Sequence, residues 1–391
     1  MNTFDQLKAR GFVSQHTDED GLRRAFDAGP VTFYIGFDPS AASLHVGHLV
    51  QVMTMTWLEK LGHRPIGVVG GGTMMVGDPT GRDAMRDLLT TEVIDTNKRA
   101  LKEQLSRFVN APLYDNAEWL LPLNYVSFLR DIGSRFSVNR MLSTEGVKQR
   151  LERNQGLSFI EFNYPLMQAY DYLELYRRHG CTLQVGGGDQ WFNIISGVDL
   201  IRRVEGAEVQ ALTTPLLTTA SGAKMGKTAG GAVWVDGAMT SPYDFYQYWY
   251  NGDDRDVARF LLLFTTLPDE EVAEVAAWSF PDAKRRLAWE VTARVHGTAA
   301  ADGAADAAKM AFAGGVSEHM PTWHTPFPVL VVDALVGAGL AKSKGEARRL
   351  IDGGGVSIGE AKVAGWTVSI DGPCVLWAGK KRAVRVAAEP G

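Results

Sequence analysis

Short runs of apolar and β-branched residues alternate with helical patterns through the first half of the chain. The runs cover residues 31–37, 64–69, 181–185 and 209–213, each the length of one buried strand, and a helical pattern over 43–61 separates the first two. Strands that are separated by helices pair in parallel through right-handed crossovers. The pattern therefore predicts an α/β fold with a doubly wound, Rossmann-like parallel sheet.

Three glycine-containing turns follow these predicted strands. They are Gly36-Phe37-Asp38, Gly70-Gly71-Gly72 and Gly186-Gly187-Gly188-Asp189. In an open α/β sheet, ligands bind beyond the carboxyl ends of the strands, where such turns meet. We therefore expect one pocket at this edge of the sheet.

The pattern changes at about residue 235, where strand-like runs stop. Ser241-Pro242 has the form of a helix cap followed by proline at the first helical position, and helices are predicted over 243–267 and 281–295. Glycine and proline then punctuate a linker, and the last segment mixes helical and strand patterns. The predicted domains are 1–234 (Rossmann-like), 235–315 (α-helical), a linker at 316–326, and a small α+β domain at 327–391.

Composition restricts the class of protein. The 391 residues are 45% apolar and 22% charged, which is ordinary for globular proteins. No stretch reaches the ~18 apolar residues that a membrane helix needs, and the first residues lack an apolar signal core. Cys181 and Cys374 alone make neither a disulfide framework nor a four-thiolate zinc site. We expect a cytoplasmic protein with no membrane contact.

The charge is unevenly distributed. The formal net charge is −5, yet 327–391 carries nine basic and six acidic residues, so this segment is +3 and the remainder −8. A basic segment on an acidic chain is typical of contact with an anionic partner, although scattered surface charge gives the same count.

The sequence His45-Val46-Gly47-His48 opens the helical pattern after the first strand. Its two histidines are three residues apart, so they share one face of the first helical turn, where unpaired N–H groups favour a phosphate. Gly47 leaves room for a flat ring or a ribose beside the backbone. A zinc site would need further ligands, and no HExxH motif or cysteine cluster is present. Two ordinary histidines remain the alternative.

The segment Lys224-Met225-Gly226-Lys227-Thr228 nearly completes a phosphate-binding Walker A loop. Ser221 stands where that loop requires glycine, which disfavours a P-loop nucleotidase. Two lysines in a glycine-flanked loop can still close over phosphates. An exposed basic turn is the alternative.

A helix predicted over 158–178 carries a third set of polar residues. Tyr164, Gln168 and Asp171 have the spacing i, i+4, i+7 and therefore share one stripe, while apolar and aromatic residues fill much of the remaining circumference. A buried carboxylate requires a partner. For Asp171 that partner is either a structural arginine or a hydroxyl or amine of a ligand.

The order and spacing of HxGH and KMGKT resemble the HIGH and KMSKS signatures of class I aminoacyl-tRNA synthetases. Further segments are similar to the bacterial tyrosyl enzymes, among them Tyr34-Ile-Gly-Phe-Asp38-Pro-Ser, Gly77-Asp-Pro-Thr-Gly, Tyr164-Pro-Leu-Met-Gln-Ala-Tyr-Asp171 and Gln184-Val-Gly-Gly-Gly-Asp-Gln190-Trp. Residues 327–391, through Ser343–Arg349 and Gly353–Val356, resemble an S4-type RNA-binding domain. The resemblance covers essentially the whole chain.

The resemblance implies a tyrosine–tRNA ligase. Such an enzyme activates L-tyrosine with ATP to tyrosyl-adenylate and pyrophosphate, and then transfers tyrosine to the 3′-terminal ribose of tRNA(Tyr). ATP is a substrate that carries Mg²⁺ on its phosphates, and no tightly bound metal or organic cofactor is implied. Residues 130–141 and Phe159 match the segment through which these enzymes form homodimers.

The resemblance also assigns roles by position. For tyrosine they are Tyr34 and Asp171 at the phenol, and Asp78, Tyr164, Gln168 and Gln190 at the ammonium group. For the adenylate they are Gly36, Asp38, Gly47, Gly187 and Asp189. For the phosphates and catalysis they are Ser40, His45, His48, Arg82, Arg86, Lys224, Lys227 and Thr228. For RNA we select the basic residues Lys344, Arg348, Arg349, Lys380, Lys381 and Arg382.

Three positions depart from the family pattern. Ser40 replaces the usual threonine, Arg82 the usual lysine, and Gly226 the first serine of KMSKS. None removes the chemistry, since hydroxyl and charge are kept at the first two positions.

Three other functions remain open. A tryptophanyl ligase has no need of the Tyr34/Asp171 pair, and a nucleotidyltransferase of the same superfamily would lack KMGKT and the added domains. A non-catalytic RNA-binding descendant would not need the complete set of pocket residues.

Overall fold

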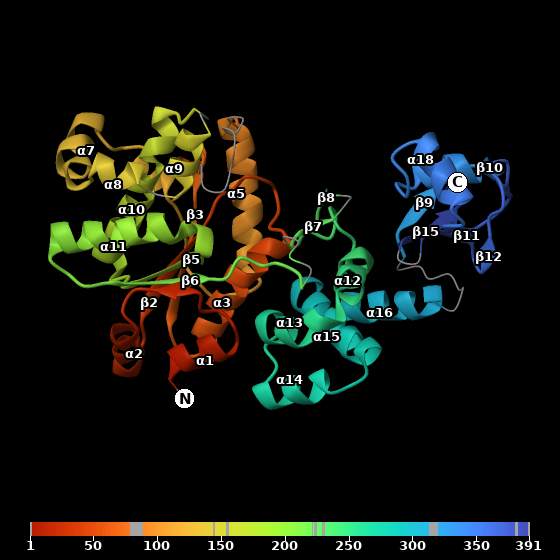
Figure 1. The fold of residues 1–391 in the computed structure, drawn as a ribbon, viewed down its shortest axis with the longest axis horizontal. Coiled ribbons are helices and arrows are strands. Elements are labelled where there is room, and N and C mark those ends of the chain that lie inside the picture. The colour runs from red at the N-terminus through yellow and green to blue at the C-terminus, as the bar shows by residue number, and fades with distance from the viewer. Residues whose placement is uncertain are drawn as a thin grey trace. The chain divides into compact units, whose positions relative to one another are not determined.

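A computed structural model of the chain describes residues 2–78, 89–143, 145–153, 156–220, 222, 225–228, 231–312, 320–379 and 382–389 (Figure 1). The chain divides into two compact units. The first comprises Met1–Val235 and Leu262–Thr266, and the second comprises Asp236–Leu261 and Leu267–Gly391.

A six-stranded sheet forms the centre of the first unit. Its strands are β1 (Gln15–His16), β2 (Thr32–Phe37), β3 (Arg64–Val69), β4 (Leu113–Asp115), β5 (Leu183–Gly187) and β6 (Gln210–Thr214). Their order is β1-β6-β5-β2-β3-β4, with β1 antiparallel to β6 and the other pairs parallel. The predicted parallel sheet is confirmed, and the short antiparallel edge strand makes it mixed.

The strand order reverses between β2 and β5. From β2 the chain continues outward to β3 and β4, and then returns to place β5 and β6 on the other side of β2. This is the switch point at which a doubly wound sheet opens a crevice at its carboxyl edge.

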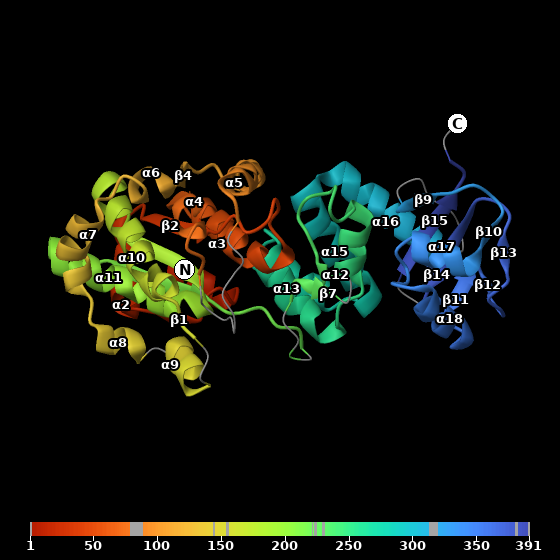
Figure 2. The ribbon, with the colours of Figure 1, turned by 90° about the horizontal axis from the view of Figure 1, so that it is seen from above.

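Helices surround this sheet (Figures 1 and 2). They are α1 (Thr3–Ala9), α2 (Glu19–Ala28), η1 (Val46–His48), α3 (Leu49–Lys60), α4 (Gly71–Met74), α5 (Thr91–Ser106), α6 (Ala117–Leu120), α7 (Tyr125–Asp131), η2 (Gly133–Arg135), α8 (Val138–Leu142), α9 (Glu145–Glu152), α10 (Phe159–His179), η3 (Gly188–Gln190) and α11 (Trp191–Glu205). A small hairpin of β7 (Lys227–Thr228) and β8 (Gly231–Ala232) completes the unit.

Both faces of the sheet are covered. On one face Tyr34, Ile66 and Val68 pack in a buried cluster with residues of α10 and α11. Alternate positions along a strand face the other way, and the Cβ position of Gly67 accordingly points toward Leu113 and toward Met55 of α3. Burial on both faces explains why these strands are almost continuously apolar.

Helix α10 confirms the helix predicted over 158–178. Ser158 caps it by accepting the Glu161 N–H, and the Glu161 carboxylate accepts the Ser158 N–H in return. The helix ends at Gly180, whose φ of +62° is the left-handed conformation that favours glycine.

The helix predicted over 43–61 begins later than expected. His45 is extended and caps the single 3₁₀ turn η1, and the α-helix α3 begins only at Leu49. Because the helix begins so late, the Gly47 N–H lacks the backbone carbonyl partner that a longer helix would provide. The His45 ring accepts this N–H instead.

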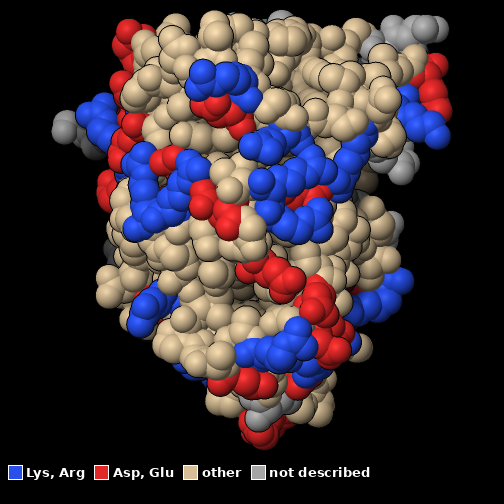
Figure 3. All heavy atoms as spheres, turned by 90° about the vertical axis from the view of Figure 1, so that its left-hand side faces the viewer, with Lys and Arg blue, Asp and Glu red and all other residues tan. Residues whose placement is uncertain are grey.

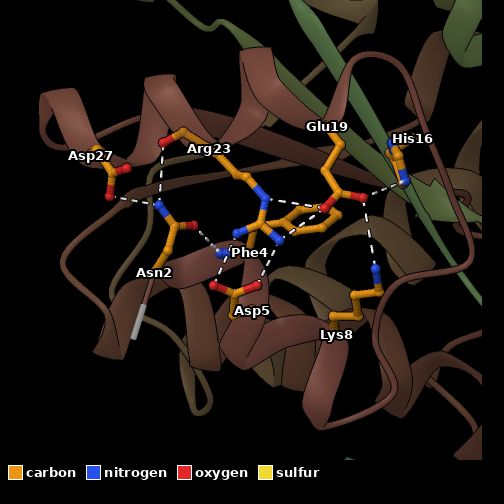
Figure 4. A network of polar contacts seen from close by, with 8 residues as sticks. All are labelled: Asn2, Phe4, Asp5, Lys8, His16, Glu19, Arg23 and Asp27. Atoms are coloured by element: carbon orange, nitrogen blue, oxygen red, sulfur yellow. Dashed lines mark hydrogen bonds and ion pairs between the residues drawn. The ribbon is translucent and has the colours of Figure 1, made fainter.

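The two N-terminal helices are fixed to each other by an ionic network (Figure 4). Arg23 of α2 donates to Asp5 of α1 at 2.6 and 2.9 Å and to Glu19 at 2.8 Å, and its guanidinium lies over the Phe4 ring. The hydrogen bond from Arg23 holds the pKa of Asp5 below its usual value.

The second unit begins with helices. These are α12 (Pro242–Tyr250), η4 (Asp254–Asp256), α13 (Val257–Phe264), α14 (Asp269–Ala276), α15 (Phe280–His296) and α16 (Thr298–Phe312). Ser241 caps α12 with proline at its first turn, as predicted. The single helix predicted over 243–267 is wrong, because Asn251 and Gly252 interrupt it.

The end of α13 belongs to the first unit. Arg10 donates to the Leu262 carbonyl at 2.9 Å, and the Trp57 indole donates to the Thr265 carbonyl at 3.1 Å. The predicted boundary at 234/235 lies one residue from that of the first unit, but the sequence did not indicate that Leu262–Thr266 returns to it.

The last part of the second unit mixes strands and helices. Its elements are β9 (Thr322–His324), β10 (Val329–Leu330), α17 (Val331–Gly337), α18 (Lys344–Asp352), β11 (Val356–Ile358), β12 (Ala361–Lys362), β13 (Ser369–Ile370), β14 (Cys374–Ala378) and β15 (Arg382–Ala387). A five-stranded sheet has the order β12-β11-β14-β15-β9, and β10 pairs with β13. Both helices pack on this segment's own apolar core.

Among the described helices, none has both the length and the apolar character needed to cross a bilayer.

Candidate active site

A cavity of about 590 Å³ opens at the carboxyl edge of the first unit's sheet. Fourteen of the residues selected from the sequence line it: Tyr34, Gly36, Asp38, Ser40, His45, Gly47, His48, Asp78, Tyr164, Gln168, Asp171, Gly187, Asp189 and Gln190. They come from β2, η1, α10, β5 and η3 and from the loops beside them. The switch between β2 and β5 therefore brings together residues that are up to 156 positions apart in the chain.

Asp171 lines this cavity, and no arginine among the described residues pairs with it. It is only 4% exposed, and its two carboxylate oxygens accept hydrogen bonds from Asn116 Nδ2 at 2.9 Å and from Trp119 Nε1 at 2.7 Å. Burial raises the pKa of Asp171 to about 7, although both hydrogen bonds oppose that rise. Both donors are neutral, so they orient the carboxylate without compensating its charge. Within the described residues Asp171 forms no structural ion pair, and Arg82 and Arg86 lie outside them.

Tyr34 and Asp171 together form the floor of the cavity. The Tyr34 hydroxyl is buried and has no hydrogen-bond partner among the residues that the structure describes. The pKa of Tyr34 is raised well above its ordinary value, mainly by burial and to a lesser extent by the nearby Asp171 charge. The phenol therefore stays neutral and can donate. An unpaired buried hydroxyl is costly unless a ligand supplies the missing partner.

Further carboxylates line the cavity above this floor. Tyr164 donates to Asp38 at 3.2 Å, and Gln190 donates to Asp78 at 2.6 Å. Burial, followed by the Asp38 charge, raises the pKa of Tyr164 well above its ordinary value, which keeps its hydroxyl a donor. These bonds fix the carboxylates in place and suit a cationic group of a ligand.

The two histidines of the HxGH sequence stack on each other. Their ring centroids are 3.8 Å apart and their planes differ by 18°. His45 Nδ1 accepts the Gly47 N–H at 3.0 Å, and His48 Nδ1 accepts the His45 N–H at 3.1 Å. Each neutral ring therefore carries its proton on Nε2. Burial, with the neighbouring His45, lowers the pKa of His48 to about 3, so this ring is neutral.

This geometry changes the expected phosphate contact. The sequence argument relied on free backbone N–H groups at the start of the helix, but the histidine rings already accept two of them. The Nε2–H groups of the rings are the donors that the HxGH turn offers instead.

Gly226 lies against the HxGH turn. Its φ is +92°, and a Cβ atom built there would lie 3.1 Å from the Gly47 nitrogen. The Gly226 carbonyl accepts the Val233 N–H, and the Val233 carbonyl accepts the Val46 N–H. Serine at this position would be strained and crowded, which gives a physical reason for the departure from KMSKS.

The cationic residues expected at the phosphates are the part of the site that the structure does not describe. Arg82, Arg86 and Lys224 lie outside the described residues, as do the side chains of Lys227 and Thr228. Among the described residues that line the cavity, the charged side chains are all aspartates. No group of three or more metal-binding side chains occurs within the described ranges.

Sequence reasoning missed the residues that orient Asp171. Asn116 also accepts the Gly72 N–H at 2.7 Å and donates to Thr73 at 3.0 Å, so it connects α4 to α10. Asn116 directly follows β4, a three-residue strand that the apolar pattern did not reveal. Its position at a strand's carboxyl end is the signal that could have indicated it.

Four of the six basic residues selected for RNA lie on α18 and β15. Lys344, Arg348, Arg349 and Arg382 are exposed. Lys344 pairs with Asp333 at 2.5 Å, and the Arg348 guanidinium lies over the Trp366 ring. Ser343 caps α18 as predicted, but Glu346 accepts the Lys342 N–H rather than that of Ser343. Lys380 and Lys381 lie outside the described residues.

Comparison with known proteins decides the family. The family model described as "tRNA synthetases class I (W and Y)" matches residues 27–313. The chain belongs to this family. Its sequence is 50% identical to a tyrosine–tRNA ligase of Acetivibrio thermocellus, over 98% of this chain and 99% of that protein. It is 49% identical to one of Rhizobium meliloti, over 96% of each. The chain is thus a bacterial-type tyrosyl member of the family.

Solved structures agree with the fold. A truncated mitochondrial tyrosyl-tRNA synthetase of Aspergillus nidulans superposes with a TM-score of 0.72 at 31% identity, over 79% of this chain and 93% of that one. A tryptophanyl-tRNA synthetase of Giardia lamblia reaches a TM-score of 0.58 at 14% identity, over 76% and 86%. The second likeness concerns the fold alone.

Proposed function

We propose that this chain is a tyrosine–tRNA ligase, an ATP-dependent enzyme that activates L-tyrosine and then transfers it to tRNA(Tyr). Tyrosine–tRNA ligases with about half of their residues identical over nearly the full length support the overall reaction. The assignment of tyrosine as the substrate rests on the two residues at the floor of the cavity. There, an oriented Asp171 carboxylate and a Tyr34 hydroxyl that has no partner among the described residues line one cavity.

A phenol fits these two groups because it both donates and accepts. Its O–H donates to Asp171, and its oxygen accepts from Tyr34, so the Tyr34 hydroxyl gains a partner and the Asp171 carboxylate gains a third donor. Phenylalanine would leave the buried Tyr34 hydroxyl without this partner and would place no donor at the Asp171 carboxylate, and rejection follows from that cost. We assign the ammonium group to Asp78, Tyr164, Gln168 and Gln190.

Activation requires positioning more than acid–base chemistry. The tyrosine carboxylate is already ionised, attacks the α-phosphorus of ATP and expels pyrophosphate. We assign Asp38, Gly36, Gly47, Gly187 and Asp189 to the adenosine part and the Nε2–H groups of His45 and His48 to the phosphates, with Ser40 beside them. Charge that develops on the phosphates is stabilised by fixed donors and by Arg82, Arg86, Lys224 and Lys227. Mg²⁺ enters on the ATP phosphates and neutralises part of their charge.

For tRNA we propose the basic face of the C-terminal segment. Residues 327–391 act as an S4-like RNA-binding domain, with the helical domain at 235–315 before them. The exposed Arg348, Arg349 and Arg382, with Lys344, contact phosphates and position the tRNA without reading bases.

A symmetric homodimer is the proposed assembly. Figure 3 shows a mostly uncharged area, interrupted by one group of charged side chains, in the upper part of the end of the first unit that carries α7. Exposed apolar residues gather on α7 to α10 and just before them: Leu121, Tyr125, Val126, Leu129, Val138, Leu142, Phe159 and Ile160. Such a patch is typical of a subunit interface. We place the enzyme in the cytoplasm, where its thiols Cys181 and Cys374 stay reduced.

A tryptophanyl activity is the remaining alternative, because the family model includes both types. The test is ATP–pyrophosphate exchange by the purified chain with tyrosine, tryptophan and phenylalanine in turn. We expect exchange with tyrosine and at least ~100-fold lower kcat/KM with the other two, since each leaves the Tyr34/Asp171 pair unsatisfied. Exchange that prefers tryptophan would contradict the proposal.

A further inference from the structure

Arg178 lies over the outer face of the indole that holds Asp171. Its guanidinium carbon is 5.4 Å from the centre of the Trp119 ring, which is a cation–π distance. Trp119 is 3% exposed, and its Nε1–H donates to Asp171 at 2.7 Å. One indole therefore joins a surface arginine to the carboxylate on the cavity floor.

The arginine is itself held in place. Its Nε and Nη2 donate to one oxygen of Glu174 at 2.8 and 2.7 Å. The Glu174 side chain is only 12% exposed. Tyr170 also donates a hydrogen bond to Glu174. Burial is the main cause, and this hydrogen bond the second cause, of a Tyr170 pKa raised to about 12.

Helix geometry explains how these groups align. Asp171, Glu174 and Arg178 have the spacing i, i+3, i+7 on α10, so they lie along one side of the helix. Trp119 comes from α6, where it spans the two turns between Asp171 and Arg178. The stripe that supplies Tyr164, Gln168 and Asp171 to the cavity thus continues to the arginine.

We propose that Arg178 is a positioning residue for tyrosine recognition, which acts through Trp119 to keep the Asp171 carboxylate directed at the substrate phenol. This inference rests on the proposed function, since it concerns how the assigned phenol site is held. A ring that is covered on its outer face cannot swing its N–H away from Asp171. Without the cover, Asp171 keeps Asn116 alone as a fixed donor and gains freedom to rotate.

The effect must be selective. Phenylalanine has no group that bonds Asp171, so its binding is indifferent to the carboxylate's orientation. A general loosening of the fold would instead raise the KM values of tyrosine, phenylalanine and ATP together. The Arg178–Glu174 pair considered alone is a partly exposed ion pair, which contributes little to stability.

The neighbouring arginine provides a matched control. Arg177 has a similar exposure, pairs with Glu205 at 2.7 Å and also approaches Glu174 at 3.8 Å. Arg177→Ala therefore removes an ion pair from the same turn of the same helix, whereas Arg178→Ala also uncovers Trp119.

Pyrophosphate exchange by the full-length variants tests the proposal. For Arg178→Ala we expect the KM for tyrosine to rise about two- to fivefold, the effect of one cation–π contact, with kcat and the KM values for ATP and phenylalanine unchanged. Arg178→Lys keeps a cation and should restore most of the loss. Equal tyrosine KM values in the two alanine variants, or a parallel rise for phenylalanine, would overturn the inference.

A double-mutant cycle with Trp119→Phe isolates the route. That change keeps a ring beneath Arg178 but removes the N–H that reaches Asp171. If Arg178 acts through this bond, Arg178→Ala adds no further loss of tyrosine selectivity in the Trp119→Phe background. Independent, multiplicative effects would show that the arginine acts by another route. An absence of tyrosine-dependent exchange by the unaltered chain would instead sink the proposed function itself.

Discussion

The floor of the cavity and the exposed helix α18 use charge in opposite ways. Asp171 is buried, its partners are neutral donors, and burial raises its pKa to about 7. The basic residues of α18 are exposed, and one of them, Lys344, already pairs with an acidic neighbour. The cavity floor is a fixed set of hydrogen-bonding groups that a single substrate group completes. The basic side chains of α18 are instead solvated, and their charge acts at longer range.

The difference predicts two kinds of recognition. A buried group that a wrong ligand leaves unpaired gives selectivity that salt hardly changes. Exposed cations that contact phosphates give affinity with little selectivity, and salt weakens it. Changes in the two regions should therefore separate cleanly in tyrosine activation and tRNA charging.

Asp171→Ala should have the largest effect. It removes the acceptor for the substrate phenol, and it takes away the acceptor of the Trp119 N–H and of one of the two Asn116 N–H groups. We expect kcat/KM for tyrosine to fall about 100-fold, while the value for phenylalanine changes little, so that selectivity collapses. Pyrophosphate exchange with both amino acids measures this, and circular dichroism monitors folding. Undiminished selectivity would remove the phenol from this site.

The pH dependence of tyrosine activation should reflect the protonation of Asp171. Because the pKa of Asp171 is about 7, the group becomes protonated below that pH, and its proton competes with the two N–H donors. We expect kcat/KM for tyrosine to fall about tenfold per pH unit below 7 in the free enzyme. This decrease below pH 7 (the acidic limb of the pH profile) should be absent with phenylalanine as substrate and in the Asp171→Asn variant. A limb that persists in Asp171→Asn would assign it to another group.

Arg349→Ala should have the smallest effect, and only in the second region. We expect tRNA charging at low salt to weaken a few-fold, the dependence of log K on log salt to become shallower by about one, and tyrosine activation to stay the same. Filter binding of tRNA(Tyr) at several salt concentrations measures the slope. Asp371→Ala, an acidic change in the same segment, provides the control. An unchanged slope would count against a phosphate contact at this arginine.

The sequence was sufficient for the features that short-range chemistry determines. Strand β3 has the predicted bounds, the other three predicted strands lie within two residues of theirs, and Ser158, Ser241 and Ser343 cap the helices expected to follow them. The spacing of Tyr164, Gln168 and Asp171 placed all three on one stripe, and all three line the cavity. Periodicity and capping depend on residues within about two turns, so they can be inferred locally.

The partners of those residues could not be inferred in this way. The spacing left Asp171 with either an arginine or a ligand as its partner, and it did not indicate Asn116 and Trp119, which donate to Asp171 from more than 50 positions earlier in the chain. The start of the HxGH helix was misjudged for a related reason, since the histidine rings bond to the backbone of their own turn.

By itself, then, the sequence determined that a doubly wound sheet gathers tyrosines, aspartates and histidines at one edge, because each strand and helix is specified by its own neighbours. Only the tertiary structure decided that the buried Asp171 carboxylate has neutral donors and that the Tyr34 hydroxyl has no partner among the described residues. It also decided that Arg178, two turns from Asp171, covers the Trp119 indole. Such partners depend on which segments the strand order β5-β2-β3-β4 brings side by side, and no local pattern encodes that order.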